Sequence, residues 1–277
     1  MDLSIVIVSW KVREKLSANL NALFNSQGDF KYEVFVVDNN SGDGSVEMIK
    51  KEFPLVKVIA NSDNRGFAAA NNQALKDCGG KYLLLLNPDM QLQPNTLARM
   101  VAWMDNNPQA TVGGCKLIKE KGEIIKHVRR FPKLIDQLMI TLKLPHIFPR
   151  IVNKYLYSDF DYSRAAKVDS IRGAFFMINR EAYQRISNQN IPLLDERYFI
   201  WFEEVDFCRE VYRLGGEVWY TPAAECVDYI GQSFAQVRRG QAQKYFSDSM
   251  IKYFRKWEPK PESFILATAW QFIRAFL

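Results

Sequence analysis

Apolar residues in the first 90 positions alternate between strand-like and helix-like patterns. Four runs of β-branched and aliphatic residues have the length of a strand: residues 3–9 ("LSIVIVS"), 33–37 ("EVFVV"), 56–59 ("VKVI") and 82–86 ("YLLLL"). Between them apolar residues recur every three or four positions, which predicts helices. One helix is expected to be capped by Ser45, and another to span Phe67–Cys78. Strands alternating with helices predict an α/β fold whose open, mostly parallel sheet is covered on both faces.

The second half of the chain is less regular. Residues 130–157 mix aromatic, proline and basic residues, as loops and short helices do. Beyond them we expect a buried strand at Ile171–Asn179 ("IRGAFFMIN"), a helix at Phe202–Leu214 and a strand at Glu217–Tyr220 ("EVWY"). Helical patterns dominate from about Gln236 to the end.

Composition narrows the function classes. The 277 residues carry a net charge of +6 with a pI near 9.0, which suggests affinity for nucleic acid, nucleotide phosphates or an acidic membrane surface. The four cysteines form no CxxC pair, so we expect free thiols in a reducing compartment and no zinc site. With two histidines, mechanisms that need several are nearly excluded.

We expect neither a signal peptide nor a membrane span. Asp2 precedes a strand-like run and no basic segment leads it. The candidate apolar segment Ser263–Ile273 is far shorter than the roughly 20 residues that a spanning helix needs.

Polar residues follow each of the four predicted strands. They are Ser9-Trp10, Asp38 to Ser41, Asn61 to Asn64, and Asn87-Pro88-Asp89. Because ligands of open α/β sheets bind beyond the carboxyl ends of the strands, we expect these residues to meet at one rim. Asp38 and Asp89 either cap turns or serve a ligand, Asp38 through a base or ribose and Asp89 through a cation.

The phosphate-binding loops of other α/β proteins are absent. The segment "SWKVREKL" after the first strand has no glycine, so GxGxxG is missing, and GxxxxGK[ST] does not occur. If phosphate binds, a divalent cation held by carboxylates is the usual way to offset its charge.

Two further acidic segments are candidates for chemistry. "FIWFEEVDFCRE" places Glu203, Glu204 and Asp206 at a predicted helix start, where they either complement the helix dipole or supply a general base. "AECVDYIGQS" contains Asp228, which is either structural or ligand-facing.

Taken together, the chain from about residue 3 to 257 resembles glycosyltransferase family 2, in particular bacterial rhamnosyltransferase-type members acting on lipid-linked glycans. The motifs that carry the resemblance, in order, are "SIVIVSW", "VVDNNSGDGS", "NRGFAAANN", "LLLLNPDM", "IRGAFFMINR", "FEEVDFCREVYRLGG" and "VDYIGQSF". The resemblance implies a GT-A fold, an open mixed, mostly parallel sheet flanked by helices, with residues 1–110 as the nucleotide-sugar half and 111–235 as the acceptor half. Residues 236–277 would form a helical extension.

The resemblance also implies residue roles. Asp89 stands in the DxD-type metal motif and would hold Mg²⁺ or Mn²⁺ against the donor diphosphate. Glu204, or its neighbour Glu203, stands where the family has its catalytic aspartate. Asp228 stands where the family commonly has a metal-binding histidine; a carboxylate suits the same ions. The nucleotide-sugar pocket would be formed by Ser9, Trp10, Asp38, Asn40, Asn64, Arg65, Asn87, Gly173 and Ala174, with Arg130 and Arg129 assisting at the phosphates.

The expected reaction is a single displacement with inversion, most simply of L-rhamnose from dTDP-rhamnose onto a lipid-linked saccharide. The metal would stabilise the departing diphosphate, and Glu204 would deprotonate the acceptor hydroxyl. A UDP-sugar donor is the near alternative. A nucleotidyltransferase should have a glycine-rich basic loop after its first strand, and a nucleic-acid-binding protein should have a basic face, whereas acids occupy the predicted rim.

The C-terminal segment combines basic residues with later aromatic ones such as Phe264, Trp270, Phe272 and Phe276. This pattern fits a segment that lies on an anionic bilayer without crossing it, and equally a helix packed on the core or in a homo-oligomer interface. With a lipid-linked acceptor, we expect a cytoplasmic protein at the inner face of the cell membrane.

Overall fold

The computed structural model describes residues 1–229 and 237–274. The strands are β1 (Leu3–Ser9), β2 (Tyr32–Asp38), β3 (Lys57–Ala60), β4 (Tyr82–Leu86), β5 (Met90–Leu92), β6 (Ala110–Ile118), β7 (Ala166–Lys167), β8 (Phe175–Asn179) and β9 (Glu217–Asp228). The helices are α1 (Arg13–Phe24), α2 (Ser45–Glu52), α3 (Phe67–Leu75), α4 (Thr96–Asn106), α5 (Leu134–Thr141), α6 (Pro149–Tyr155), α7 (Arg180–Ser187), α8 (Glu203–Arg213), α9 (Arg239–Trp257) and α10 (Lys260–Arg274).

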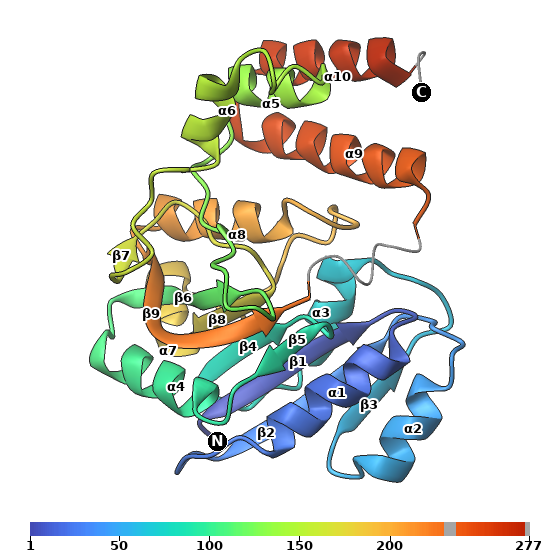
Figure 1. The fold of residues 1–277 in the computed structure, drawn as a ribbon, viewed down its shortest axis with the longest axis vertical. Coiled ribbons are helices and arrows are strands. Elements are labelled where there is room, and N and C mark those ends of the chain that lie inside the picture. Colours follow the sequence, from blue (N-terminus) through green and yellow to red (C-terminus); the bar gives the residue numbers. More distant parts are fainter. Residues whose placement is uncertain (230–236, 275–277) are drawn as a thin grey trace.

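A single mixed sheet organises the described residues (Figure 1). Its strand order is β3-β2-β1-β4-β8-β6-β9-β5, with β7 paired to β9. The first four strands in this order are parallel, as predicted, and β8 runs antiparallel between β4 and β6. At the far edge β9 is parallel to β6 and antiparallel to β5. The predicted open, mixed sheet is confirmed.

The alternation of side chains along β1 divides the core into two layers. Ile5 and Ile7 belong to a cluster with the apolar faces of α1, α2 and α4. Val6 and Val8 belong to a second cluster, with α3, α7 and α8. Since successive strand residues point to opposite faces, a strand buried on both faces is largely apolar; all seven residues of β1 are buried, and five of them are Leu, Ile or Val.

The C-terminal helices form a separate layer beyond α8, together with α5 and α6 (Figure 1). Its core joins Phe202 and Val205 to residues of α9 and α10 such as Phe254 and Leu266. Buried Asp206 of α8 fastens this layer: Lys256 Nζ donates to it at 2.7 Å and Trp257 Nε1 at 2.6 Å. Asp206 is therefore structural.

Four predicted boundaries are corrected. Ser45 is the first residue of α2 and does not cap it; Gly44 takes the cap position, and Asp43 accepts hydrogen bonds from the Ser45 amide and hydroxyl. α3 ends at Leu75, three residues before Cys78, with a turn leading to the glycine pair. β8 begins only at Phe175, because residues 171–174 form a loop. β9 continues from Tyr220 to Asp228 past Pro222, through a register shift against β6.

Several predicted features lie outside the described residues. They are the domain boundary between 235 and 236, the end of the "VDYIGQSF" motif, and Phe276. Within the described ranges, no helix has both the length and the apolar character needed to cross a bilayer.

Candidate functional site

A cleft of about 700 Å³ lies beyond the carboxyl ends of β1 and β4, between the sheet, the start of α8 and the start of α9. The four polar strand ends meet here, as the fold class predicted. The predicted site residues that line it are Trp10, Asn64, Asn87, Asp89, Gly173, Ala174, Glu203 and Glu204.

Asn39, at the end of β2, organises one wall of the cleft. Its Nδ2 donates to Asn64 Oδ1 and to the Gly66 carbonyl, each at 3.1 Å. Its Oδ1 accepts from the Arg65 amide at 3.2 Å. Asn39 was among the polar residues expected at this rim, but it was not among those predicted for the nucleotide-sugar pocket, where its neighbours Asp38 and Asn40 were named.

The remaining predicted nucleotide residues of this wall lie outside the lining of the cleft. Asp38 and Ser9 are buried beneath it; Asp38 Oδ2 accepts from the Ser41 amide at 3.0 Å. Within the described chain, Asp38 Oδ1 and Ser9 Oγ have no hydrogen-bond partner. Asn40 is exposed in a left-handed conformation (φ 62°), and exposed Arg65 lies 3.5 Å from Asp63.

Asp89 follows β4 in a turn that Asn19 of α1 holds in place. Asn19 Nδ2 donates to the carbonyls of Asn87 and Met90, at 3.1 and 2.8 Å. The Asn87 amide donates to the Ala174 carbonyl at 2.9 Å, which joins the turn to the loop before β8. The buried strand β4 is thus followed by a charged residue that faces a cavity: Asp89 is only 4% exposed, yet it lines the cleft.

The pairing of β5 with β9 brings Asp228 close to Asp89. Met90 stands opposite Asp228 in this antiparallel pair, and the Tyr229 amide donates to the Asp89 carbonyl at 3.2 Å. The Asp228 side chain is 1% exposed, outside the lining of the cleft, and Arg172 Nη1 donates to its Oδ2 at 2.8 Å.

These two carboxylates fit a divalent cation whose coordination is completed by a ligand. In the described part of the chain, no group of three or more His, Cys, Asp and Glu residues could enclose an ion. Mg²⁺, however, is commonly bound by one or two carboxylates together with substrate phosphates and water. Asp89 and Asp228 would offer hard oxygen ligands of that kind.

Glu203 and Glu204 begin α8 at another wall of the cleft. The two residues before them, Trp201 and Phe202, have left-handed backbones (φ 64° and 70°), which is costly for large side chains and typical of functional sites. A Cβ built on Gly173 would lie 3.5 Å from Glu204 Cβ, so the loop before β8 passes directly beside Glu204.

Burial raises the pKa of both glutamates. For Glu203 the charge of Glu204 raises it further, whereas the charge of Arg172 partly opposes the rise at Glu204. Among the described residues, Glu203 Oε2 and Glu204 Oε2 have no hydrogen-bond partner. A carboxylate with a raised pKa, facing a cleft, is suited to accept a proton from a hydroxyl group.

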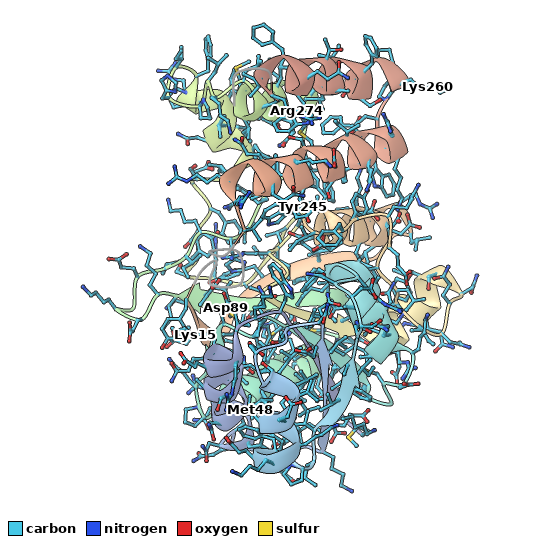
Figure 2. All side chains as sticks on the ribbon, turned by 90° about the vertical axis from the view of Figure 1, so that its right-hand side faces the viewer. Lys15, Met48, Asp89, Tyr245, Lys260 and Arg274 are labelled. Carbon is cyan, nitrogen blue, oxygen red and sulfur yellow. The ribbon has the colours of Figure 1, made fainter. Side chains whose placement is uncertain are left out.

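An aromatic wall stands next to the glutamates. The rings of Phe199 and Tyr245 stack with centroids 4.6 Å apart at 30°, and both line the cleft with Trp201. Figure 2 shows Tyr245 on α9 above Asp89, and Gln241 adds a polar group from α9. The sequence did not predict that α9 lines the cleft, because the position of α9 depends on how the C-terminal layer packs against α8.

The aromatic wall is joined to the wall that carries Asn39. The Phe67 amide donates to the Phe199 carbonyl at 2.7 Å. A Cβ on Gly66 would lie 2.4 Å from that carbonyl oxygen, and the φ of Gly66 is +82°. This contact therefore requires glycine at position 66.

The two arginines predicted at the phosphates lie outside the lining of the cleft. Arg129 Nη1 donates to the backbone carbonyls of Lys126, Val128 and Leu156. The Arg130 guanidinium lies over the Tyr157 ring, 4.2 Å from its centroid.

Comparisons with known proteins identify relatives of this chain. Residues 4–187 match the family described as Glycosyl transferase family 2. A relative from Mycobacterium tuberculosis, N-acetylglucosaminyl-diphospho-decaprenol L-rhamnosyltransferase, is 23% identical over 72% of this chain and 67% of its own. Rhamnosyltransferase WbbL of Escherichia coli is 25% identical, covering 78% of each chain.

A solved structure shares the fold. The mannosyltransferase PcManGT from Pyrobaculum calidifontis, in complex with GDP-Man and Mn²⁺, has a TM-score of 0.59 and 16% identity, covering 97% of this chain and 68% of its own. The GT-A fold implied by the sequence is confirmed.

Proposed function

Because the chain belongs to glycosyl transferase family 2, and is therefore a glycosyltransferase, we propose that it moves L-rhamnose from dTDP-rhamnose onto a lipid-linked saccharide with inversion. The observation that carries the proposal is that Asp89 and Glu204, from opposite halves of the chain, line one cleft. The two rhamnosyltransferase relatives support the choice of sugar.

In this proposal Asp89 and Asp228 hold a Mg²⁺ or Mn²⁺ ion. Such an ion, when bound, supplies positive charge that stabilises the departing diphosphate. Trp10, Asn39 and Asn64 line the space for the nucleotide.

The donor sugar lies beside Gly173 and Ala174 in this arrangement. Small side chains at these two positions leave room for it next to Glu204.

Glu204 is the proposed base. A carboxylate oxygen of Glu204 accepts the proton of the acceptor hydroxyl while the hydroxyl oxygen attacks the anomeric carbon from the face opposite the nucleotide. The bond between the anomeric carbon and the diphosphate oxygen breaks in the same step, and the nucleoside diphosphate leaves. Burial raises the pKa of the Glu204 carboxyl, which makes it a better proton acceptor for a hydroxyl group than an exposed glutamate would be. Glu203 lies deeper and is 4% exposed, which favours Glu204 for contact with substrate.

Residues 1–110 would then bind the donor and residues 111–235 the acceptor, with the extension of residues 236–277 contributing the aromatic wall from α9. Phe199, Trp201 and Tyr245 offer flat apolar faces against which a saccharide ring can lie.

The test of donor and metal is a thermal-shift screen of dTDP, UDP and GDP, each with and without Mn²⁺ or Mg²⁺. We expect the largest stabilisation from dTDP, and only with metal. A larger response to UDP would keep the family and replace the donor with a UDP-sugar. No response to any nucleotide, together with salt-dependent binding of DNA, would contradict the proposal.

We also propose that the protein lies at the anionic inner face of the cell membrane, where a lipid-linked acceptor would be found. The outward face of α10 carries apolar and uncharged residues: Pro261, Phe264, Ile265, Thr268, Gln271 and Phe272. Phe264 is 72% exposed and Phe272 is 61% exposed, and cationic Lys260 and Arg274 stand at the helix ends. This composition fits an interfacial helix.

Flotation with vesicles containing anionic lipid tests this placement. The Phe264→Ser/Phe272→Ser double variant should float less than the wild type, while Leu55→Ser, at an exposed leucine of the N-terminal half, should float normally. Equal flotation of the two variants and the wild type would contradict membrane contact through α10.

A further inference from the structure

The ion pair between Arg172 and Asp228 has an unusual position. Asp228 is a 1% exposed carboxylate at the end of β9, and Arg172 Nη1 donates to it at 2.8 Å from the loop before β8. Arg172 is itself 34% exposed at its side chain and lines the cleft. One partner is fixed in the sheet, whereas the other lies on a loop at the cleft wall.

Asp228 cannot hold both a metal ion and the Arg172 guanidinium at short distance, because the two cations would repel each other. A buried carboxylate needs a counter-charge, and here the guanidinium supplies it. A divalent cation between Asp89 and Asp228 would supply the same counter-charge more strongly and would repel the guanidinium at short distance. The two cations therefore compete for Asp228.

A displaced Arg172 would remain within the site. Arg172 lines the cleft together with Glu204, and a Cβ built on its neighbour Gly173 would lie 3.5 Å from Glu204 Cβ. Because Arg172 lines the cleft, a diphosphate bound there would present oxygen atoms that fit its planar guanidinium fork.

We propose that Arg172 is an internal counter-ion for Asp228 which the divalent cation displaces, and which then binds the donor diphosphate. Arg172 would keep the buried carboxylate neutralised before loading, and would add positive charge to the leaving group after it. The inference rests on the proposed function for the identity of that leaving group.

Titration of the metal-free protein with Mn²⁺ alone, by calorimetry or by the Mn²⁺ EPR signal, tests the competition. Arg172→Gln should bind Mn²⁺ at least about tenfold more tightly than the wild type, because no guanidinium has to be displaced. Arg172→Lys, which keeps the charge, should stay close to the wild type. Lys116→Gln is the matched control. Lys116 of β6 pairs at 3.3 Å with Glu225 of β9, the strand that also carries Asp228.

A second titration, with dTDP, UDP or GDP at saturating Mn²⁺, tests the second half of the proposal. Arg172→Gln should bind the preferred nucleotide about tenfold more weakly, because one charge-assisted contact is lost. Unchanged nucleotide affinity would contradict the transfer of Arg172 to the diphosphate. Unchanged or weaker Mn²⁺ affinity in Arg172→Gln would overturn the competition.

A double-mutant cycle separates this competition from general damage to the fold. In Asp228→Asn, the further change Arg172→Gln should not tighten Mn²⁺ binding, because the carboxylate over which the cations compete is gone. Tightening of the same size in both backgrounds would refute the pairing. Failure of sugar transfer with these binding results intact would refute the proposed function and leave the competition standing.

Discussion

The wall of the cleft that carries Asn39 is built from strand ends, whereas the wall that carries Glu204 is built from a helix start, a strained loop and a helix of the C-terminal layer. In the first wall Asn39, Asn64 and Asn87 are fixed by hydrogen bonds of 2.9 to 3.1 Å to neighbouring segments. In the second, Phe199 and Tyr245 come from distant segments, and the layer depends on the buried Asp206.

Under the proposed function, this difference would suit a division of tasks between donor and acceptor binding. A nucleotide diphosphate has few variants, and strand ends with fixed amides and carboxylates suit it. An acceptor saccharide varies far more, and a wall made of side chains from an appended helical layer can change without disturbing the sheet. The two walls should therefore be separable by mutation.

Glu204→Gln should have the largest effect, and on one wall only. Transfer should fall by about 10²- to 10⁴-fold, because the amide cannot accept the acceptor proton. Nucleotide affinity, measured by calorimetry with Mn²⁺, should stay within about twofold of the wild-type value, because the wall that binds the donor is unchanged. Glu210→Gln, on the same helix and paired to Arg213, is the control. Full turnover by Glu204→Gln would remove the assigned base and direct attention to Glu203.

Asp89→Ala should damage the opposite wall. In the presence of Mn²⁺ it should bind dTDP at least about tenfold more weakly than the wild type, since even indirect ligand contacts contribute that much. Without metal the two proteins should bind equally. Equal affinity with and without metal in both proteins would show that Asp89 holds no ion.

Asp206→Ala should loosen the helical layer. It leaves Lys256 and the Trp257 indole without their buried acceptor, which should lower the free energy of unfolding by about 3 kcal/mol in urea denaturation. The folded variant should keep its nucleotide affinity. Loss of nucleotide affinity in step with stability would show that the two walls are one unit and that the division of tasks is wrong.

Glu203→Gln should have the smallest effect, and one that depends on pH. Burial raises the pKa of Glu203 in the folded protein, so its stabilising contribution is complete at pH values below the ordinary carboxyl pKa and is lost as the pH rises through the raised value. Glutamine cannot ionise. The variant should therefore be more stable than the wild type at neutral pH, as measured by urea denaturation, with the difference vanishing in acid. A difference independent of pH would contradict the assignment.

The wall that carries Asn39 could be predicted from the sequence, whereas the wall that carries Glu204 could be predicted only in part. β1 to β4 follow from local periodicity, and the position of Asp89 follows from the rule for strand ends. The proximity of Asp228 to Asp89 could not be derived from spacing, because it depends on β5 leaving the parallel set to pair with β9. β9 was predicted too short because proline is unusual inside a strand and Pro222 lies within it. Arg172 was predicted inside a strand, whereas it lies in the loop before β8.

Gly66 has a consequence for the order of events. Its missing side chain allows the Phe199 carbonyl to rest on the donor loop at a distance that excludes any Cβ. A nucleotide that tightens the loop around Asn64 would therefore press directly on the segment that carries the aromatic rings. Under the proposed function, binding of the donor and binding of the acceptor would therefore be coupled through the backbone contacts of Phe199 with Gly66 and Phe67, which would favour an ordered addition of the two substrates.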